Sequence, residues 1–172
     1  MSGPAGFAEF VSARYPALVR YGTLLTGDSG HGEDLTQEAL VKTYRGWHRL
    51  GFPDDGDPEA YTRQVMARAA WRAARRLWRR EIPAAAPPER AAAGDPYESR
   101  DTASLVLDAL RELPAGQRVV LVLRYWAGLS EHEIATQLGC SSGTVKSRAS
   151  RAITTMRRTP ALADAFTLSE TS

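Results

Sequence analysis

Near the C-terminal end of this 172-residue chain, two strong helix signals stand close together. Ser130 and Glu133 are spaced as a capping box, in which the serine side chain accepts from the Glu133 amide and the glutamate reaches back to the helix start. Gly139 fits the left-handed position that follows a helix end. Ser141 or Ser142 can then cap a second helix, and the sequence leaves that choice open. This stretch is therefore restricted to two short helices joined by a tight turn.

The apolar residues of these two helices predict how they pack. The first helix directs Ile134, Ala135 and Leu138 inward. The inward positions of the second follow a helical period: Val145, Ala149, Ala152, Ile153 and Met156. This layout is typical of a helix-turn-helix, whose second helix enters the major groove of DNA. The positions expected to face outward suit phosphates and guanine edges: Ser142, Lys146, Ser147, Arg148, Ser150 and Arg151.

The net charge of +2 conceals blocks of opposite sign. Residues 142–158 hold five bases and no acid, and residues 61–80 hold seven arginines and no acid. Residues 28–59 hold eight acids and three bases. Either basic block alone is compatible with a solvated helix face, and the C-terminal helix pair alone with an ordinary helical hairpin. Two acid-free blocks in one small chain favour two footprints for a polyanion.

The N-terminal basic block lies on a helix that Asp57 should cap and Pro58 should begin. Trp71 and Trp78 are seven residues apart and so share a face of this helix, with arginines around them. Aromatic rings among cations suit a nucleic-acid strand whose bases are unstacked. The alternative is that both tryptophans belong to the core and the arginines are solvated.

A helix predicted from about residue 33 to residue 50 carries an acidic stripe. The stripe follows the spacing i, i+3, i+4, i+7 and consists of Asp34, Gln37, Glu38 and Val41. Such a stripe repels DNA, so it is either a solvated face or a docking surface for a protein. The residues of this helix expected to face the core are Leu35, Ala39, Thr43, Tyr44 and Trp47.

Helical periodicity extends over the chain, and we find no alternating pattern typical of strands. A helical segment begins near Phe7, and Pro16 is expected to interrupt or restart it. Residues 82–100 are rich in proline and alanine, which predicts a linker. The predicted fold class is therefore all-α, with two small helical domains joined by a flexible linker, the second containing the helix-turn-helix. The expected boundaries are 5–81, 82–101, 102–158 and a tail at 159–172 with no assigned role.

The sequence lacks the residue patterns that metal-binding proteins, cofactor-binding proteins and enzymes require. His31, His48 and His132 have no metal-ligand spacing, and no phosphate loop or catalytic constellation appears, so no metal site, cofactor or enzymatic activity is predicted. The single cysteine, Cys140, permits no internal disulfide and is expected to pack in the turn, with a redox role as the alternative. The chain shows no membrane span or signal peptide, which predicts a soluble, cytoplasmic protein.

Four short motifs give the chain a family resemblance. Residues 34–39 read DLTQEA, 113–118 read LPAGQR, 129–135 read LSEHEIA and 143–148 read GTVKSR. Together they resemble the extracytoplasmic-function group of bacterial RNA polymerase sigma factors, in the sigma-70 superfamily. The resemblance extends from about residue 7 to residue 158 and implies the two core regions of such factors. Where family members often carry Asn and Asp in the third helix, this chain has Ala69 and Ala73.

The resemblance implies a role for each patch. The acidic stripe would bind core RNA polymerase, the linker would pass through the polymerase, and the helix-turn-helix would read the −35 element as duplex. The Arg-rich helix and the loop before it would open and hold the −10 element as a single strand. The residues implied for that strand are Tyr61, Arg68, Trp71, Arg72, Arg75, Arg76 and Arg79.

The predicted function is thus a sigma factor that directs promoter-specific initiation, with core polymerase and promoter DNA as partners. The free chain is expected to be a monomer; anti-sigma factors are common in the family, and nothing in the sequence identifies one. One alternative is a stand-alone helix-turn-helix regulator whose first domain senses a ligand or dimerises. A nucleic-acid-modifying enzyme is a second alternative, disfavoured by the missing catalytic set.

Overall fold

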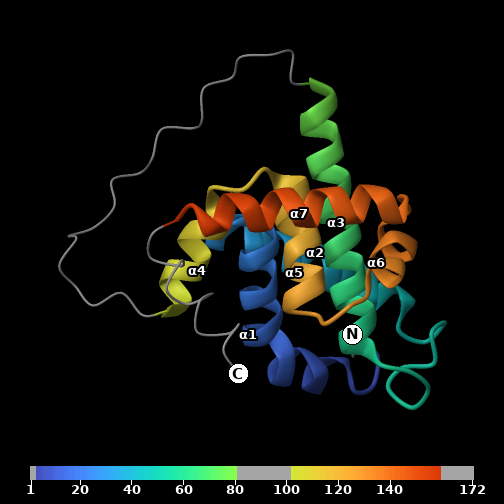
Figure 1. Cartoon of the computed structure of the whole chain (residues 1–172). Helices are drawn as coiled ribbons and strands as arrows, with labels where there is room; N and C mark the ends of the chain where they lie inside the picture. Colours follow the sequence, from blue (N-terminus) through green and yellow to red (C-terminus); the bar gives the residue numbers. More distant parts are fainter. Residues whose placement is uncertain (1–2, 81–101, 160–172) are drawn as a thin grey trace, which may run out of the picture.

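The structure is a computed structural model that describes residues 3–80 and 102–159. These residues form helices and no strands, as the all-α prediction requires (Figure 1). The helices are α1 (Phe7–Thr26), α2 (Ser29–Gly46), α3 (Pro58–Arg80), α4 (Thr102–Arg111), α5 (Ala115–Tyr125), α6 (Glu131–Leu138) and α7 (Ser142–Arg157). The predicted linker at 82–101 and nearly all of the predicted tail lie outside the described residues.

Helix α1 runs through Pro16 without the interruption predicted for it. Proline removes one backbone hydrogen bond from a helix, so something else must hold the two halves together. On the N-terminal side, the rings of Phe7 and Phe10 lie 5.1 and 5.5 Å from that of Trp47. On the C-terminal side, Leu18 is completely buried. Packing on both sides of the proline therefore keeps the helix continuous.

Helix α2 begins four residues earlier than predicted and ends before Trp47. It starts at Ser29 because the Asp28 carboxylate accepts from the His31 amide at 2.8 Å, which satisfies a free donor of the first turn. The prediction that Tyr44 faces the core is wrong, since the residue is 45% exposed. Its ring lies at the edge of the aromatic cluster, 5.1 Å from Phe7, and only one side of it is covered.

Helices α1 and α2 approach each other at two glycines. A Cβ atom on Gly22 would lie 2.4 Å from the carbonyl oxygen of Gly32, and one on Gly32 would lie 2.4 Å from the amide nitrogen of Thr23. The Thr36 hydroxyl, also buried here, is within hydrogen-bonding distance of the Leu18 carbonyl, at 3.2 Å. The two backbones can pack this closely only because neither glycine carries a side chain.

The caps predicted for α3, α6 and α7 are confirmed. Asp57 accepts from two amides at the start of α3. Ser130 and Glu133 form both bonds of the capping box at α6, and Gly139 is left-handed with φ 67°. Of the two serines left open for the last helix, Ser141 is the cap, because its hydroxyl accepts from the Thr144 amide at 3.1 Å.

Helices α1–α3 and helices α4–α7 share one continuous hydrophobic core. Met66 and Trp71 of α3 belong to the same buried cluster as Val119 and Leu123 of α5. Figure 1 shows α5 beside α1 and α3, with α7 crossing in front of them. Polar contacts seal the seam between α1 and the C-terminal helices: Arg111 Nε donates to the Gly27 carbonyl at 2.7 Å, and Arg118 donates to the Thr26 carbonyl. Helices α1–α3 and helices α4–α7 therefore pack directly against each other.

Candidate nucleic-acid interface

Helix α7 presents most of the predicted DNA-reading residues to solvent. Ser142, Lys146, Ser147, Ser150 and Arg151 are all exposed. Val145 and Ala149, on the opposite side, are buried against α5 and α6. The first turn of α7, which Ser141 caps, contains no acid, and the outward residues of the helix offer only hydroxyls and cations. This is the chemistry that phosphates and guanine edges accept.

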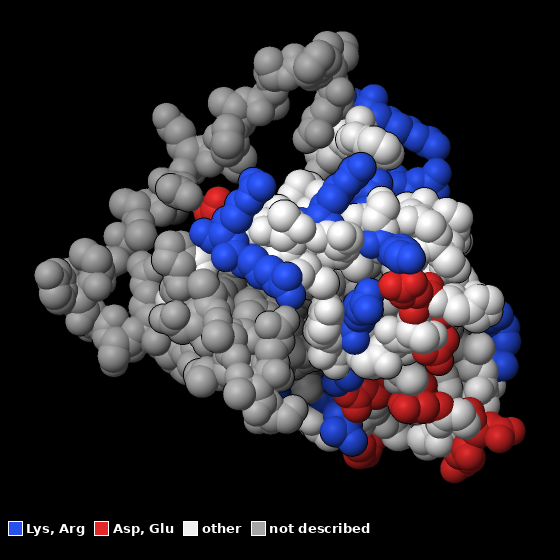
Figure 2. Space-filling view, in the orientation of Figure 1, with Lys and Arg blue, Asp and Glu red and all other residues white. Residues whose placement is uncertain are grey.

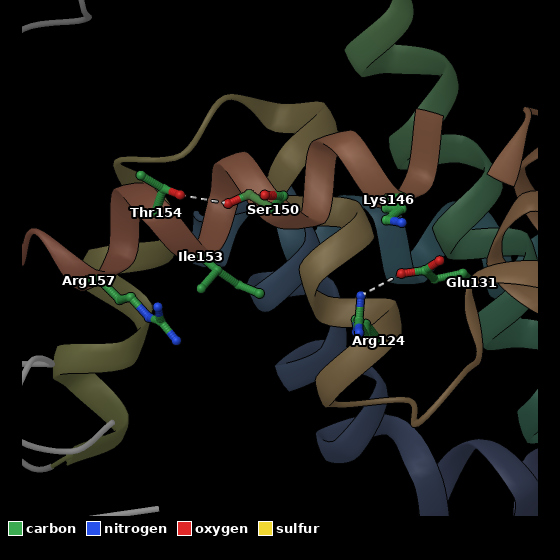
Figure 3. Close-up of a pocket in the computed structure, with 7 residues that line it drawn as sticks. All are labelled: Arg124, Glu131, Lys146, Ser150, Ile153, Thr154 and Arg157. Carbon is green, nitrogen blue, oxygen red and sulfur yellow. Dashed lines mark hydrogen bonds and ion pairs between the residues drawn. The ribbon is translucent and has the colours of Figure 1, made fainter. Parts of the chain in front are cut away.

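An open hollow of about 310 Å³ lies along this face of α7 (Figure 3). Helix α7 lines one side of it with Lys146, Ser150 and Arg157, among others. The other side is an ion pair, in which Arg124 Nη1 lies 2.9 Å from Glu131 Oε1. The glutamate is the one acid of the lining, and its partner is a cation. The hollow is consequently suited to an anionic backbone that follows α7.

Arg148 is the exception among the predicted reading residues, because it is only partly exposed. Its guanidinium carbon lies 5.0 Å from the ring centroid of Trp71 and 5.2 Å from that of Trp78, both on α3. Burial lowers its pKa, although an arginine stays charged at neutral pH. Each such cation–π contact contributes roughly 0.5–2 kcal/mol, more where water is excluded. The expectation that Arg148 faces outward is therefore wrong for this closed arrangement.

Gly116, in the first turn of α5, makes room for that guanidinium. A Cβ atom on Gly116 would lie 2.4 Å from Nη1 of Arg148 and 3.5 Å from the Trp71 ring. We call the contact among Arg148, Trp71 and Trp78, with Gly116 beneath it, the interdomain clamp. It joins the predicted −35 helix to the predicted −10 helix, a connection that the sequence analysis did not anticipate.

The arginines of α3 that the sequence analysis named for the −10 strand reach solvent. The exposed set is Arg68, Arg72, Arg75, Arg76 and Arg79. The two tryptophans differ: Trp71 is 3% exposed and Trp78 is 68% exposed. Trp71 thus fits the core alternative while the domains are closed. Arg68 also bridges the domains, since its Nε donates to the Gln137 carbonyl of α6 at 2.9 Å.

Tyr61 is half-buried at the start of α3, where the loop 47–57 covers it. Its ring lies 5.9 Å from that of Phe52, which in turn lies 5.4 Å from Trp47. The Trp47 indole nitrogen donates to the Ala5 carbonyl at 3.0 Å. The sequence analysis missed this aromatic cluster, whose members come from α1, the 47–57 loop and α3. This aromatic cluster holds the 47–57 loop against the start of α3.

Charge is divided across the molecule. Figure 2 shows Lys and Arg gathered over α7 and the end of α3, with Asp and Glu collected toward the opposite edge of that face. The last turns of α3, which carry Trp78 and Arg79, project beyond the other helices (Figure 1). The two basic segments that are far apart in sequence are therefore neighbours in space.

The acidic stripe is fully accessible. Asp34, Gln37, Glu38 and Val41 are all exposed, and Val41 is 48% exposed despite its apolar side chain. Helix α2 packs against α1 and α3, so its stripe faces away from the clamp. An exposed valine at the end of a row that holds two carboxylates suits a protein surface with both cations and an apolar patch.

Arg118 is a further residue that the sequence analysis passed over. It lies in the first turn of α5, and it donates to the carbonyls of Leu110, Leu113 and Thr26. Burial lowers its pKa. The signal in the sequence was a cation next to the valines and leucines of residues 119–123. An arginine in such a buried position needs acceptors for its donors, and backbone carbonyls can supply them.

Two models of known protein families match this chain. Residues 10–80 match the family model described as sigma-70 region 2, and residues 103–156 match that described as sigma-70, region 4. The RNA polymerase sigma-E factor of Streptomyces avermitilis is 40% identical over 153 residues, covering 88% of this chain and 83% of that protein. The ECF RNA polymerase sigma factor SigL of Mycobacterium tuberculosis is 33% identical over 147 residues, covering 83% and 81%.

A solved structure is similar as well. It is the sigma factor RpoE of Bartonella quintana in complex with the anti-sigma factor NepR, with a TM-score of 0.57 and 25% identity. The match covers 88% of this chain and 94% of that one. None of the described helices combines the length and hydropathy that a bilayer span requires. Within the same residues, no cluster of three or more His, Cys, Asp or Glu side chains is arranged to hold a metal ion.

Proposed function

Because this chain belongs to the extracytoplasmic-function group of sigma-70 family RNA polymerase sigma factors, we propose that its exposed patches divide the work of promoter recognition. Core polymerase and promoter DNA are the partners of such a factor, and the polymerase supplies the chemistry. The observation that carries the assignment is the acid-free exposed face of α7, behind a Ser141 cap and a Gly139 turn.

The −35 element would be read by α7 as duplex. The proposed contacts are Ser142, Lys146, Ser147, Arg148, Ser150 and Arg151. Lys146 and Ser150 border the hollow beside α7, which suits a phosphate backbone, while the first turns of the helix enter the groove. Arg148 joins this set only when it leaves the clamp.

The −10 element would be held as a single strand along α3. The proposed contacts are Tyr61, Arg68, Trp71, Arg72, Arg75, Arg76 and Arg79. Exposed arginines attract the backbone, and aromatic rings among them can stack on unpaired bases. Trp71 can contribute only after the C-terminal helices move away from α3, because they now cover it.

The stripe on α2 would dock on core polymerase through Asp34, Gln37, Glu38 and Val41. Its exposure and its position away from the clamp support this role. Because the stripe and DNA are both negatively charged, the stripe would repel DNA, which would bind the basic face of the molecule instead. On this division, domain 5–81 binds polymerase and the −10 strand, and domain 102–158 reads the −35 duplex.

An anti-sigma factor is a further partner that we propose for this chain. The similar RpoE chain was solved with the anti-sigma factor NepR, and the match covers both helical groups.

Run-off transcription with purified core polymerase tests the proposal. We expect the chain to direct transcripts that begin at defined positions on a subset of genomic promoters, and to co-purify with core. A chain that bound no core polymerase would refute the assignment, whatever its affinity for DNA. A stand-alone regulator would instead bind palindromic duplex sites as a dimer without polymerase.

A further inference from the structure

We propose that residues 3–6, which we call the N-terminal strap, position the 47–57 loop against α3 and thereby help to set which bases this factor accepts in the −10 element. The inference rests on the proposed function, in which α3, with the loop before it, holds the −10 strand. It gives the start of the chain a role in promoter specificity that is exerted through the loop.

The strap is attached to the loop at two points. Trp47, the first residue of the loop, is completely buried, and its indole nitrogen donates to the Ala5 carbonyl at 3.0 Å. Gly6 packs on the ring of Pro53, since a Cβ atom on Gly6 would lie 3.1 Å from Pro53 Cγ. The φ angle of Gly6 is 81°, a left-handed conformation that favours glycine. The strap therefore follows the loop closely, and a larger residue at position 6 would push the two apart.

Aromatic rings continue this attachment to α3. The ring of Phe52, a buried residue of the loop, lies 5.4 Å from that of Trp47 and 5.9 Å from that of Tyr61. The Phe52 amide also donates to the Trp47 carbonyl at 3.0 Å. Tyr61 is one of the proposed −10 contacts. The strap is thus connected, through Trp47 and Phe52, to the site that the −10 strand would occupy.

The loop is held at its base and exposed at its tip. The Asp57 carboxylate accepts from two amides of α3, which fixes the end of the loop to that helix. The Asp55 amide donates to the Gly51 carbonyl at 2.7 Å, which closes the turn. Residues 53–57 are all exposed. A loop that is already ordered loses little conformational entropy when it binds, so its shape can accept one base and reject another.

The composition of the tip suits selection of a base more than attraction of a strand. Residues 53–57 hold three acids and no cation, so the tip repels phosphates and the attraction must come from the arginines of α3. The carboxylates of Asp54 and Asp55 can accept a hydrogen bond from the exocyclic amine of an unpaired base, as carboxylates do from cytosine. A displaced loop would therefore lose discrimination between bases while the strand stays bound.

Gly6→Ala loosens the strap without removing any side chain. Alanine disfavours the left-handed conformation, and its Cβ would displace the Pro53 ring. The matched control is Gly3→Ala in the same strap, where the new Cβ would lie in ordinary contact with the Tyr44 ring, at 3.4 Å.

Trp47→Phe is a second loosening variant. It keeps an aromatic ring beside Phe52 but loses the nitrogen that donates to the Ala5 carbonyl. Its matched control is Trp126→Phe, the same change at an exposed position after α5.

Two measurements on the full chain test the strap. The first is the mobility of a nitroxide at Asp54→Cys, in a Cys140→Ser background, from its electron paramagnetic resonance line shape. The second is run-off transcription by the holoenzyme, at saturating factor, from promoters that differ by one base pair in the −10 element. A parallel set of promoters differs by one base pair in the −35 element.

We expect both loosening variants to make the nitroxide more mobile. They should also lower the ratio of transcription between accepted and rejected −10 bases roughly three- to tenfold, within the range that one base normally contributes. The ratios for the −35 set should stay the same, because α7 is untouched. Both controls should match the unmodified chain in mobility and in ratio.

Either of two results would overturn the proposal. In one, the nitroxide is no more mobile in the loosening variants. In the other, transcription falls by the same factor at every promoter, which would mean that the strap only stabilises the fold. A failure of the proposed function is distinguishable, because the unmodified holoenzyme would then transcribe without regard to the −10 element, whatever the mobility of the nitroxide.

Discussion

Arg124 Nη1 and Glu131 Oε1 lie 2.9 Å apart at the edge of the hollow beside α7. Each side chain is a little over one-third exposed, so the pair adds little to stability. Its position suggests another purpose, since the glutamate is the acid nearest to the proposed path of the DNA backbone (Figure 3). The arginine offsets a charge that would repel phosphates.

We therefore expect Arg124→Ala to weaken binding of the −35 duplex roughly two- to fivefold, the range typical of one exposed pair. Glu131→Ala should bind at least as tightly as the unmodified chain. The double variant should recover most of the loss, because the exposed carboxylate is then gone. Filter binding or fluorescence anisotropy would measure the duplex affinity of the unmodified chain, the two single variants and the double variant. An equal loss of affinity in Arg124→Ala and in the double variant would contradict the explanation.

Lys146→Glu tests the reading face itself. Charge reversal beside the phosphate backbone removes an attraction and adds a repulsion, so we expect the holoenzyme to lose about 10- to 100-fold in activity at a −35-dependent promoter. The logarithmic salt dependence of duplex binding should become shallower by about one or more. Lys146 suits this test better than Arg148, which also belongs to the clamp.

Arg20→Glu is the matched control for Lys146→Glu, with the same change of net charge at an exposed position on α1. We expect it to leave promoter activity close to that of the unmodified factor. Equal effects of the two variants would mean that net charge matters and that α7 does not.

The acidic stripe is tested by Asp34→Arg together with Glu38→Arg. If the stripe docks on core polymerase, reversing two charges should weaken assembly by well over tenfold, because attraction becomes repulsion at a surface that was complementary. The neutral pair Asp34→Asn with Glu38→Gln should lose less, and raising the salt concentration should narrow the difference. Competition for core polymerase measures all three. Assembly of the reversed variant at the original affinity would show that the stripe is merely solvated.

The sequence predicted the parts of this fold that local chemistry determines. Asp57, Ser130 with Glu133, and Gly139 act within one helical turn, so their capping roles could be read from spacing alone. The clamp could not be read in this way. Arg148 meets Trp71 because a glycine 32 positions earlier leaves a gap on α5, and no local pattern links those three residues.

The same reasoning explains where the site prediction was incomplete. Outward positions on α7 were identified from helical periodicity. This pattern distinguishes the face of a helix that packs in its own domain from the opposite face, but it does not show whether a second domain covers that opposite face. Arg148 satisfies the outward pattern and is nevertheless covered by α3. The burial of Trp71 has the same cause, and the exposure of Trp78 follows from its place in the projecting end of α3.

The capping box of α6 predicts a pH dependence of stability. Hydrogen bonds from the Ser130 side chain and amide hold the pKa of Glu133 below its ordinary value. A carboxyl group whose folded-state pKa is lowered stabilises the fold above its unfolded pKa, and loses that contribution as the pH falls through the folded-state pKa. Asp28, whose pKa the His31 amide lowers, acts in the same direction.

Glu133→Gln keeps an acceptor at the same place without the charge. We expect its melting temperature to lie below that of the unmodified chain at pH 7, and the gap to close toward pH 3. Thermal unfolding followed by circular dichroism at a series of pH values measures this. A gap that stays constant with pH would show that the charge of Glu133 contributes nothing to the cap.

The crossing of α1 and α2 depends on two glycines, and Gly32→Ala tests it. The added Cβ would lie 2.4 Å from the Thr23 amide nitrogen and 2.7 Å from the Gly22 carbonyl carbon, both backbone atoms that cannot rotate away. We expect the variant to lose about 1–3 kcal/mol of unfolding free energy, the usual loss from overpacking, although alanine favours a helix more than glycine does.

Gly143→Ala is the control for this prediction, because it lies in the first turn of α7 and its Cβ would meet only the Ser141 hydroxyl, at 3.8 Å. It should be as stable as the unmodified chain or slightly more stable, because alanine favours a helix more than glycine does and its Cβ displaces no other atom. Chemical denaturation of both variants separates helix propensity from close packing. Since α2 carries the proposed polymerase-binding stripe, a shifted crossing in Gly32→Ala should also reduce assembly with core, whereas Gly143→Ala should assemble normally. Equal stability of the two variants would mean that α1 and α2 can move apart without loss, and that the glycine pair does not set the position of the stripe.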